Sequence, residues 1–126
     1  MATGKTRYVI SVLVSDRVGV LRDITSAVTG MGANIDGISQ TVVEGYFTVI
    51  LTASFDKPRT PDEVRTAIEE NFPKKEASVV VRHYERRSST RRTVDGEGYV
   101  VTLTGKDRPG ILKAVTSLMA AKGINI

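Results

Sequence analysis

The sequence SDRVGVL occupies residues 15–21, and the similar sequence KDRPGIL occupies residues 106–112. Both stretches belong to a longer repeat, because residues 8–35 align with residues 99–126 without a gap, at an offset of 91. Eleven of these 28 pairs are identical, and most of the others match one apolar residue with another. A repeat of this size indicates a duplicated domain rather than a short solenoid unit.

The first copy begins with a strand followed by a helix. Residues 8–14 are rich in β-branched side chains, which predicts a strand. The apolar residues between positions 21 and 31 recur at helical spacing, which predicts an amphipathic helix over residues 18–30. Gly30 and Gly32 are expected to end this helix, because glycine tolerates the left-handed conformation of a helix C-terminus.

Three strands and a second helix complete the first copy. Residues 35–43 and 46–55 predict two strands joined by a tight turn. Residues 60–63, with the sequence TPDE, form a capping box that predicts the start of a helix, and Pro73 is expected to end it. Residues 77–84 then predict the last strand.

This order of elements predicts the fold and the domains. Two split βαβ units give an α+β, ferredoxin-like βαββαβ fold, with a four-stranded antiparallel sheet and both helices on one face. Residues 1–86 are expected to form this complete domain, and the arginine-rich residues 87–98 a linker. Residues 99–126 predict the start of a second copy, a strand (99–105) and a helix (109–122) only.

The composition limits the possible chemistry. The 126 residues include no cysteine, which excludes disulfides and thiolate metal sites and fits a cytoplasmic protein. The longest apolar runs are too short to cross a bilayer, so no membrane association is expected. His83 is the only histidine, and no carboxylate cluster lies near it in the sequence. We therefore expect it to be an ordinary strand residue rather than a metal ligand. We expect no cofactor and no enzyme activity.

The positive charge is local. The net charge is +4, and residues 82–92, with five arginines and one glutamate, alone account for it. A basic linker explains this better than a phosphate-tracking face, so direct nucleic-acid binding is not expected. One alternative is an RNA-binding ferredoxin-like sheet, which would use Tyr46, Phe47 and Phe55 to stack bases, although Phe47 and Phe55 lie on the predicted core face.

Residues 15–21 and 106–112 resemble the D-R-x-G-(I/V)-L turn of ACT domains, and the G-x-N-I of residues 32–35 and 123–126 resembles the same family's entry into its second strand. The resemblance implies a regulatory module that binds amino acids, often across dimer interfaces. The tandem copies resemble regulators of the glycine cleavage system repressor type, which implies a partner protein and a role in transcription. Val18 departs from the usual proline of the motif.

The residues themselves suggest a ligand site at this turn. A glycine allows close approach to the backbone, and the N–H groups of the first helical turn favour a carboxylate. Asp16 could accept the ammonium of the same amino acid, and Asn34 is expected to face the turn and orient the ligand. The structural alternative is that Gly19 only permits the turn, Asp16 caps the helix and Asn34 makes an Asx-turn. The candidate ligand-binding residues are Asp16, Arg17, Val18, Gly19, Val20, Leu21, Asn34 and Ile35, and in the second copy Asp107, Arg108, Gly110, Ile111, Leu112 and Asn125.

Two classes of function follow. The first is a regulatory protein that binds an amino acid and acts through a partner protein in amino-acid metabolism or transcription. The second is a ligand-free module for protein interaction or oligomerisation. In both cases a homo-oligomer, most simply a dimer, is expected, because a sheet with helices on one face leaves its edges and its other face in need of cover.

Overall fold

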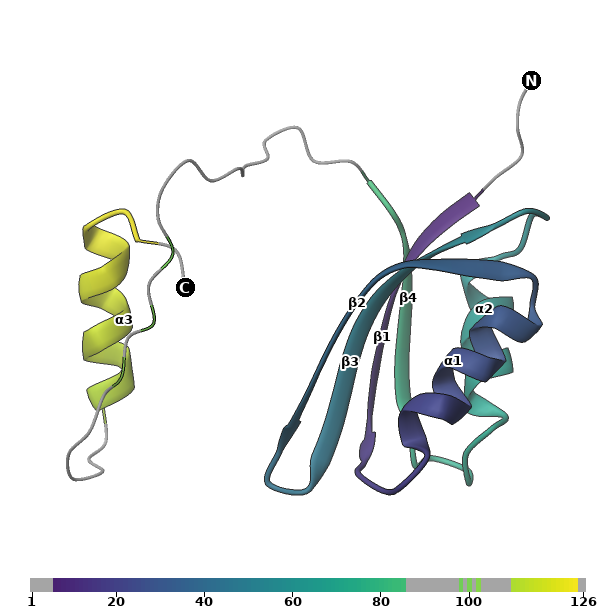
Figure 1. The fold of residues 1–126 in the computed structure, drawn as a ribbon, viewed down its shortest axis with the longest axis horizontal. Helices are drawn as coiled ribbons and strands as arrows, with labels where there is room; N and C mark the ends of the chain where they lie inside the picture. Colours follow the sequence, from purple (N-terminus) through teal and green to yellow (C-terminus); the bar gives the residue numbers. More distant parts are fainter. Residues whose placement is uncertain (1–5, 86–97, 99, 101, 103–109, 125–126) are drawn as a thin grey trace. The chain divides into compact units, whose positions relative to one another are not determined.

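The computed structural model describes residues 6–85, 98, 100, 102 and 110–124. The chain forms two compact units, residues 1–87 and 88–126. The first unit contains six elements in the order strand, helix, strand, strand, helix, strand (Figure 1). They are β1 (Thr6–Ser15), α1 (Val20–Gly30), β2 (Ala33–Val43), β3 (Tyr46–Phe55), α2 (Pro61–Glu69) and β4 (Ser78–His83). The predicted ferredoxin-like fold is confirmed.

The four strands form one sheet in the order β2-β3-β1-β4, and all neighbouring strands are antiparallel. Because β3 lies between β1 and β2, α1 must cross over the sheet to connect them, and α2 likewise connects β3 with β4. Both crossovers lie on the same face, so the first unit has one helical layer and one sheet layer (Figure 1).

Alternate side chains of the central strands form the core. Strand periodicity turns every second residue of β1 and β3 toward the helices, and these side chains are buried. They are Tyr8, Ile10, Val12 and Val14 of β1 and Phe47, Val49, Leu51, Ala53 and Phe55 of β3. The helices cover them with Val20, Ile24 and Val28 of α1 and Val64 and Ile68 of α2. Phe47 and Phe55 are therefore core residues and do not form a base-stacking platform.

Tyr8 places a polar group in this core. Its ring is fully buried and packs edge-on against Phe55, with ring centres 5.6 Å apart. The phenol donates a hydrogen bond to the backbone carbonyl of Arg59, so the hydroxyl has a partner. Burial, and to a smaller extent the charge of Glu63, raise the pKa of the Tyr8 phenol.

The two helices of the first unit begin differently. At α2 the predicted capping box is present, since Thr60 Oγ1 accepts from the N–H of Glu63 (3.1 Å) and Glu63 Oε1 from the N–H of Thr60 (2.7 Å). At α1 the N-cap is Gly19, in the left-handed conformation with φ +86°, and no side chain caps the first turn. The end of α1 is also left-handed, at Gly32 (φ +84°), whereas Gly30 is an ordinary helical residue.

A β-bulge in β2 is a feature that the sequence pattern did not reveal. The register with β3 shifts between Ile35 and Gly37, so Asp36 is the extra residue. The Asp36 carboxylate accepts hydrogen bonds from Nε of Arg7 (3.2 Å) and Oγ of Ser54 (2.5 Å), which lie on the side of the sheet away from the helices. The bulge therefore places a negative charge on that side.

In the second unit the described residues form one helix, α3 (Ile111–Ala121), within the predicted range 109–122. It repeats the geometry of α1, because its N-cap Gly110 has φ +86° and Gly123, after its end, has φ +73°. The predicted strand 99–105 and linker 87–98 lie almost entirely outside the described residues. None of the helices in the described ranges is long and apolar enough to span a bilayer.

Gly19 and Gly30 provide a matched test of the left-handed turn. Gly19→Ala is expected to destabilise the first unit by about 1–2 kcal/mol, because a side chain at φ +86° clashes with its own backbone. Gly30→Ala is expected to be neutral or to stabilise by up to about 1 kcal/mol, because alanine favours the helix. Urea unfolding followed by circular dichroism measures both changes, and an equal loss in the two variants would contradict this account of the turn.

Candidate functional site

The turn predicted as a ligand site connects β1 to α1 at one end of the sheet. The backbone N–H of Asp16 donates to the carbonyl of Gly45 (2.9 Å), which holds the turn against the β2–β3 hairpin. The side chains of Asp16 and Val18 point into solvent, and Val18 is 99% exposed. The Asp16 side chain does not cap α1. The turn therefore has an exposed carboxylate beside an uncapped helix N-terminus.

Val20 and Leu21 have a structural role. Val20 is buried in the core, and Leu21 is half-buried against it. These two predicted site residues thus contribute only their backbone to the surface of the turn. Their side chains belong to the apolar face that attaches α1 to the sheet.

Arg22, which was not among the predicted site residues, covers Gly19. A Cβ atom at position 19 would lie 2.9 Å from Nη2 of Arg22, so the guanidinium group rests directly over the glycine. Arg22 remains 77% exposed in its side chain. A signal for it was present in the repeat, because the equivalent position in the second copy is Lys113, which is also basic.

Arg17 is held in place by its neighbours. Its Nη2 atom lies 2.8 Å from Oδ2 of Asp23, and its guanidinium carbon lies 5.4 Å from the centre of the Phe72 ring. Arg22 approaches the other oxygen of the same carboxylate at 3.4 Å. Hydrogen bonding from Arg17 first, with a smaller contribution from Arg22, lowers the pKa of the Asp23 carboxyl. Two guanidinium groups thus share the carboxylate of Asp23, while the carboxylate of Asp16 balances the remaining positive charge of the turn.

Asn34 and Ile35 lie at the opposite end of the first unit from the turn. Asn34 pairs with Ser54, which pairs with Arg7, whereas the turn follows Ser15. Eight residues of extended strand separate Arg7 from Ser15, which corresponds to about 26 Å. The expectation that Asn34 faces the turn therefore does not hold within one unit. The reason is that α1 runs the length of the sheet between them.

The second copy can be compared in part. Gly110, Ile111 and Leu112 begin α3 in the conformation seen at the start of α1. The other predicted site residues of this copy, Asp107, Arg108 and Asn125, lie outside the described residues.

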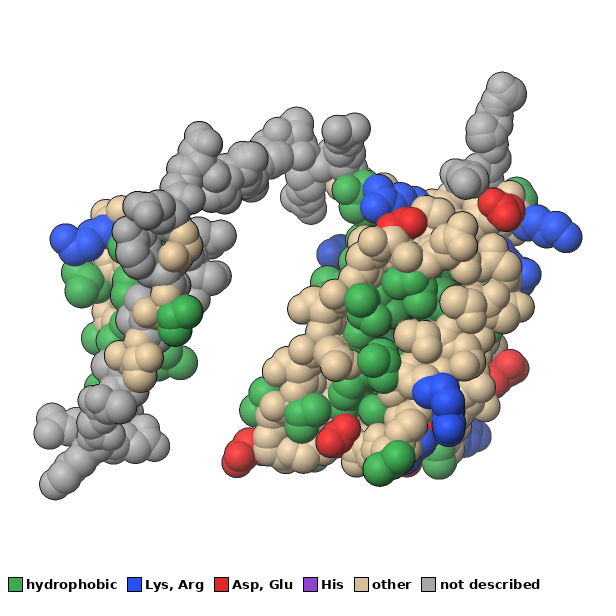
Figure 2. Space-filling view, viewed as in Figure 1, with side chains coloured by type: hydrophobic (Ala, Val, Ile, Leu, Met, Phe, Trp, Pro, Cys, Tyr) green, Lys and Arg blue, Asp and Glu red, His purple; other side chains and the backbone are tan. Residues whose placement is uncertain are grey.

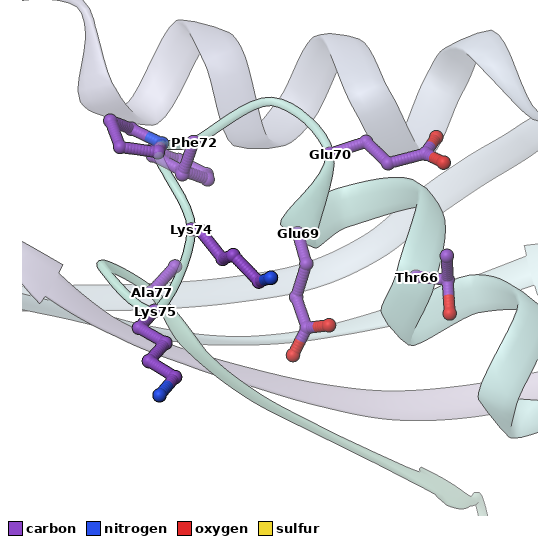
Figure 3. A pocket seen from close by; sticks show the side chains of 8 residues that line it. Thr66, Glu69, Glu70, Phe72, Lys74, Lys75 and Ala77 are labelled. Carbon is purple, nitrogen blue, oxygen red and sulfur yellow. The ribbon is translucent and has the colours of Figure 1, made fainter.

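A hollow of about 430 Å³ lies at the C-terminal end of α2. Lys74 and Glu69 extend into the same space from opposite walls, while Glu70 points away (Figure 3). Glu69 is already paired with Arg65 (3.1 Å), so the hollow offers mainly the two lysines. Its lining comprises Thr66, Glu69, Glu70, Phe72, Pro73, Lys74, Lys75 and Ala77. Phe72 connects this hollow to Arg17 of the turn.

His83 lies on the edge strand β4, and its ring centre is 4.9 Å from that of Tyr8. It therefore packs on an aromatic side chain of the core. Within the part of the chain that the structure describes, His, Asp and Glu side chains do not gather in a group of three.

The ion pairs of the turn make a testable prediction for Asp23. Arg17→Gln is expected to raise the pKa of the Asp23 carboxyl back toward the ordinary value of about 3.9, and Arg22→Gln is expected to raise it less. Because the folded-state pKa is lowered, Asp23 stabilises the fold above the unfolded-state pKa, and this contribution is lost as the pH falls through the folded-state pKa. Carbon-detected NMR titration measures the pKa, and a larger effect of Arg22→Gln would refute this assignment.

Comparison with known proteins identifies the family. The ACT domain profile matches residues 8–70. A UPF0237 protein of Corynebacterium diphtheriae is 40% identical over 52 residues, which are 41% of this chain and 58% of that relative, so the matched region spans little more than half of its length.

Two solved structures have similar folds over nearly the whole chain. One is an unknown protein from Galdieria sulphuraria, with a TM-score of 0.70 and 25% identity, covering 97% of this chain and 67% of that chain. The other is a putative glycine cleavage system transcriptional repressor, with a TM-score of 0.56 and 15% identity, covering 98% of this chain and 69% of that chain. At this identity the likeness shows a shared fold alone. Together with the profile match and the βαββαβ sheet, these findings show that the chain belongs to the ACT domain family.

Proposed function

We propose that this protein is a regulatory ACT module that binds an amino acid at the turn of residues 16–21. The observation that supports this most directly is the start of α1, where a left-handed glycine takes the place of a side-chain cap. The N–H of Val20 donates to the carbonyl of Arg17 (3.2 Å), so the N–H groups of Leu21 and Arg22 are the ones left to an anion. The adjoining guanidinium groups of Arg17 and Arg22 favour the same charge. A carboxylate of an amino acid fits this environment.

The ammonium group of the ligand would be held by Asp16 and Asn34. These residues lie at opposite ends of one unit, so a single copy does not bring them together. Pairing of the exposed edge strand β2 with β2 of a second copy, in antiparallel orientation, would bring Asn34 of that copy to the end where the turn lies. The proposed site is therefore completed by a homodimer, formed through β2.

The proposed biological role is regulation through a partner protein. Residues 99–126 are proposed to open a second ACT unit after a linker of residues 87–98, because α3 repeats the glycine geometry of α1. The fold shared with a putative glycine cleavage system transcriptional repressor supports a role in amino-acid metabolism or transcription, and the lack of cysteine supports a cytoplasmic location. The proposal assigns the chain no reaction of its own.

A second candidate function, a ligand-free interaction module, is favoured by a different observation. Ile38 and Val42 of β2 are about half exposed on an edge strand, where apolar side chains promote pairing between chains. In that case the homodimer would form in the same way, but the turn would bind nothing.

Amino-acid binding separates the two candidates. Isothermal titration of the full chain with glycine, serine and other common amino acids is expected to give saturable binding. Arg22→Gln is expected to weaken it at least about tenfold, because a charge-assisted hydrogen bond contributes about 1.5–3 kcal/mol. Arg82→Gln, which removes the same charge from an exposed site on β4, at the sheet edge opposite β2 and toward the end away from the turn, should leave the affinity unchanged. If no amino acid binds, the ligand-free module is favoured.

A mixing experiment tests whether the site is shared between copies. Asp16→Asn and Asn34→Ala should each abolish tight binding. In an equimolar mixture half of the dimers are mixed, and each mixed dimer contains one intact and one doubly altered site. About a quarter of the sites should therefore regain binding. No recovery in the mixture, with binding intact in the unaltered protein, would mean that the site does not combine these residues across a dimer.

A further inference from the structure

The side of the sheet away from the helices carries uncovered apolar side chains. This surface, the open face, is built on Val9 and Leu13 of β1, Ile50 of β3 and Val80 of β4. Leu13, Ile50 and Val80 are each about half exposed, and they lie on three adjacent strands. Figure 2 shows the first unit from the side of α1, so these side chains lie on its far side. Contiguous apolar surface of this kind marks an interaction site.

From this surface we infer that the open face packs against the open face of a second copy. The middle of the open face is uncharged, since Ser11, Thr48 and Thr52 lie between the apolar side chains. At about 3.3 Å per residue β1, β2 and β3 are about 33–36 Å long and β4 is about 20 Å long, so four strands about 4.8 Å apart present roughly 600 Å². Two copies would thus bury about 1,200 Å², the lower end of the range for specific interfaces.

The register of the sheet makes this face complementary to itself. Ile50 and Ser11 are direct neighbours on β3 and β1, the two central strands. A two-fold axis parallel to the strands and midway between β1 and β3 lays each β3 over β1 of the other copy at the same level. Ile50 then meets Ser11 of the second copy and fits between its Val9 and Leu13. A large side chain thus packs over a small one on each side of the axis.

The charges at one end of the open face suit the same arrangement. Asp36, already held by Arg7 and Ser54, lies at the β2 edge, and Arg82 lies at a similar level on β4. The same two-fold axis places β2 over β4 of the second copy, so Asp36 of each copy faces Arg82 of the other. An unrelated apolar partner would need to match both the central side chains and these two charges, whereas a second copy does so by symmetry.

Two matched variants test the inference by mass. Ile50 and Val42 are both 51% exposed, but Ile50 lies on the open face and Val42 on the helical side of the edge strand β2. In light scattering of the full chain, Ile50→Lys is expected to halve the number of chains in the assembly, with an unchanged circular dichroism spectrum. Val42→Lys is expected to disrupt only the proposed β2 pairing. An Ile50→Lys assembly of unaltered mass would overturn the inference. If the mass falls in Ile50→Lys but stays unaltered in Val42→Lys, the inference stands and the proposed β2 pairing is refuted.

Disulfide trapping provides a second measurement that does not depend on a charged substitution. The chain has no cysteine, so single cysteines can be placed without background. A mixture of Ser11→Cys chains and Ile50→Cys chains should form a linked pair on mild oxidation, because the inferred packing sets these positions opposite each other. Ser26→Cys, on the exposed side of α1, replaces Ser11→Cys in the control mixture and should link at least ten times less. Equal yields in the two mixtures would overturn the inference.

Discussion

Burial of the central strands beneath α1 is the constraint on which the rest of the first unit depends. The side chains of Ile10, Val12 and Leu51 need apolar cover, and Ile24 and Val28 provide it only if α1 lies along the sheet. This requires the chain to reverse sharply after Ser15 and to enter a helix almost at once. The left-handed glycine at position 19 makes that reversal possible, so the most distinctive turn of the surface is a consequence of core packing.

The same constraint sets the positions of the polar residues. Because α1 spans the sheet, the residues before and after it must lie at opposite ends, and no adjustment of side chains can bring Asp16 to Asn34 within one unit. A module built in this way can combine the two ends only by association with another copy. In the proposed homodimer, oligomerisation and ligand binding would be two aspects of one geometry, which suits a regulator whose assembly responds to a small molecule.

The elements of the fold could be predicted because their signals are local. The alternation of Phe47, Val49 and Leu51 defines a strand, and the box from Thr60 to Glu63 defines a helix start, in each case within a few residues of sequence. The bulge at Asp36 was not predicted, since it depends on the partner strand β3 and on contacts with Arg7 and Ser54. The turn of the candidate site was predicted because its signal is also local to the sequence. The distance from the turn to Asn34 and the position of Arg22 over Gly19 were not predicted, because they arise from three-dimensional packing.

The buried phenol of Tyr8 gives this protein an optical reporter of its own integrity. The chain has no tryptophan, so its near-ultraviolet absorption comes mainly from four tyrosines. The Tyr8 hydroxyl donates to a backbone carbonyl, and ionisation would remove that donor and leave a charge in the core. Because the folded-state pKa of Tyr8 is raised, the protonated phenol contributes its full stabilisation of the fold below the unfolded-state pKa. This contribution is lost as the pH rises through the folded-state pKa. In alkali, the late rise of tyrosinate absorbance should therefore coincide with the collapse of the β1–β3 core.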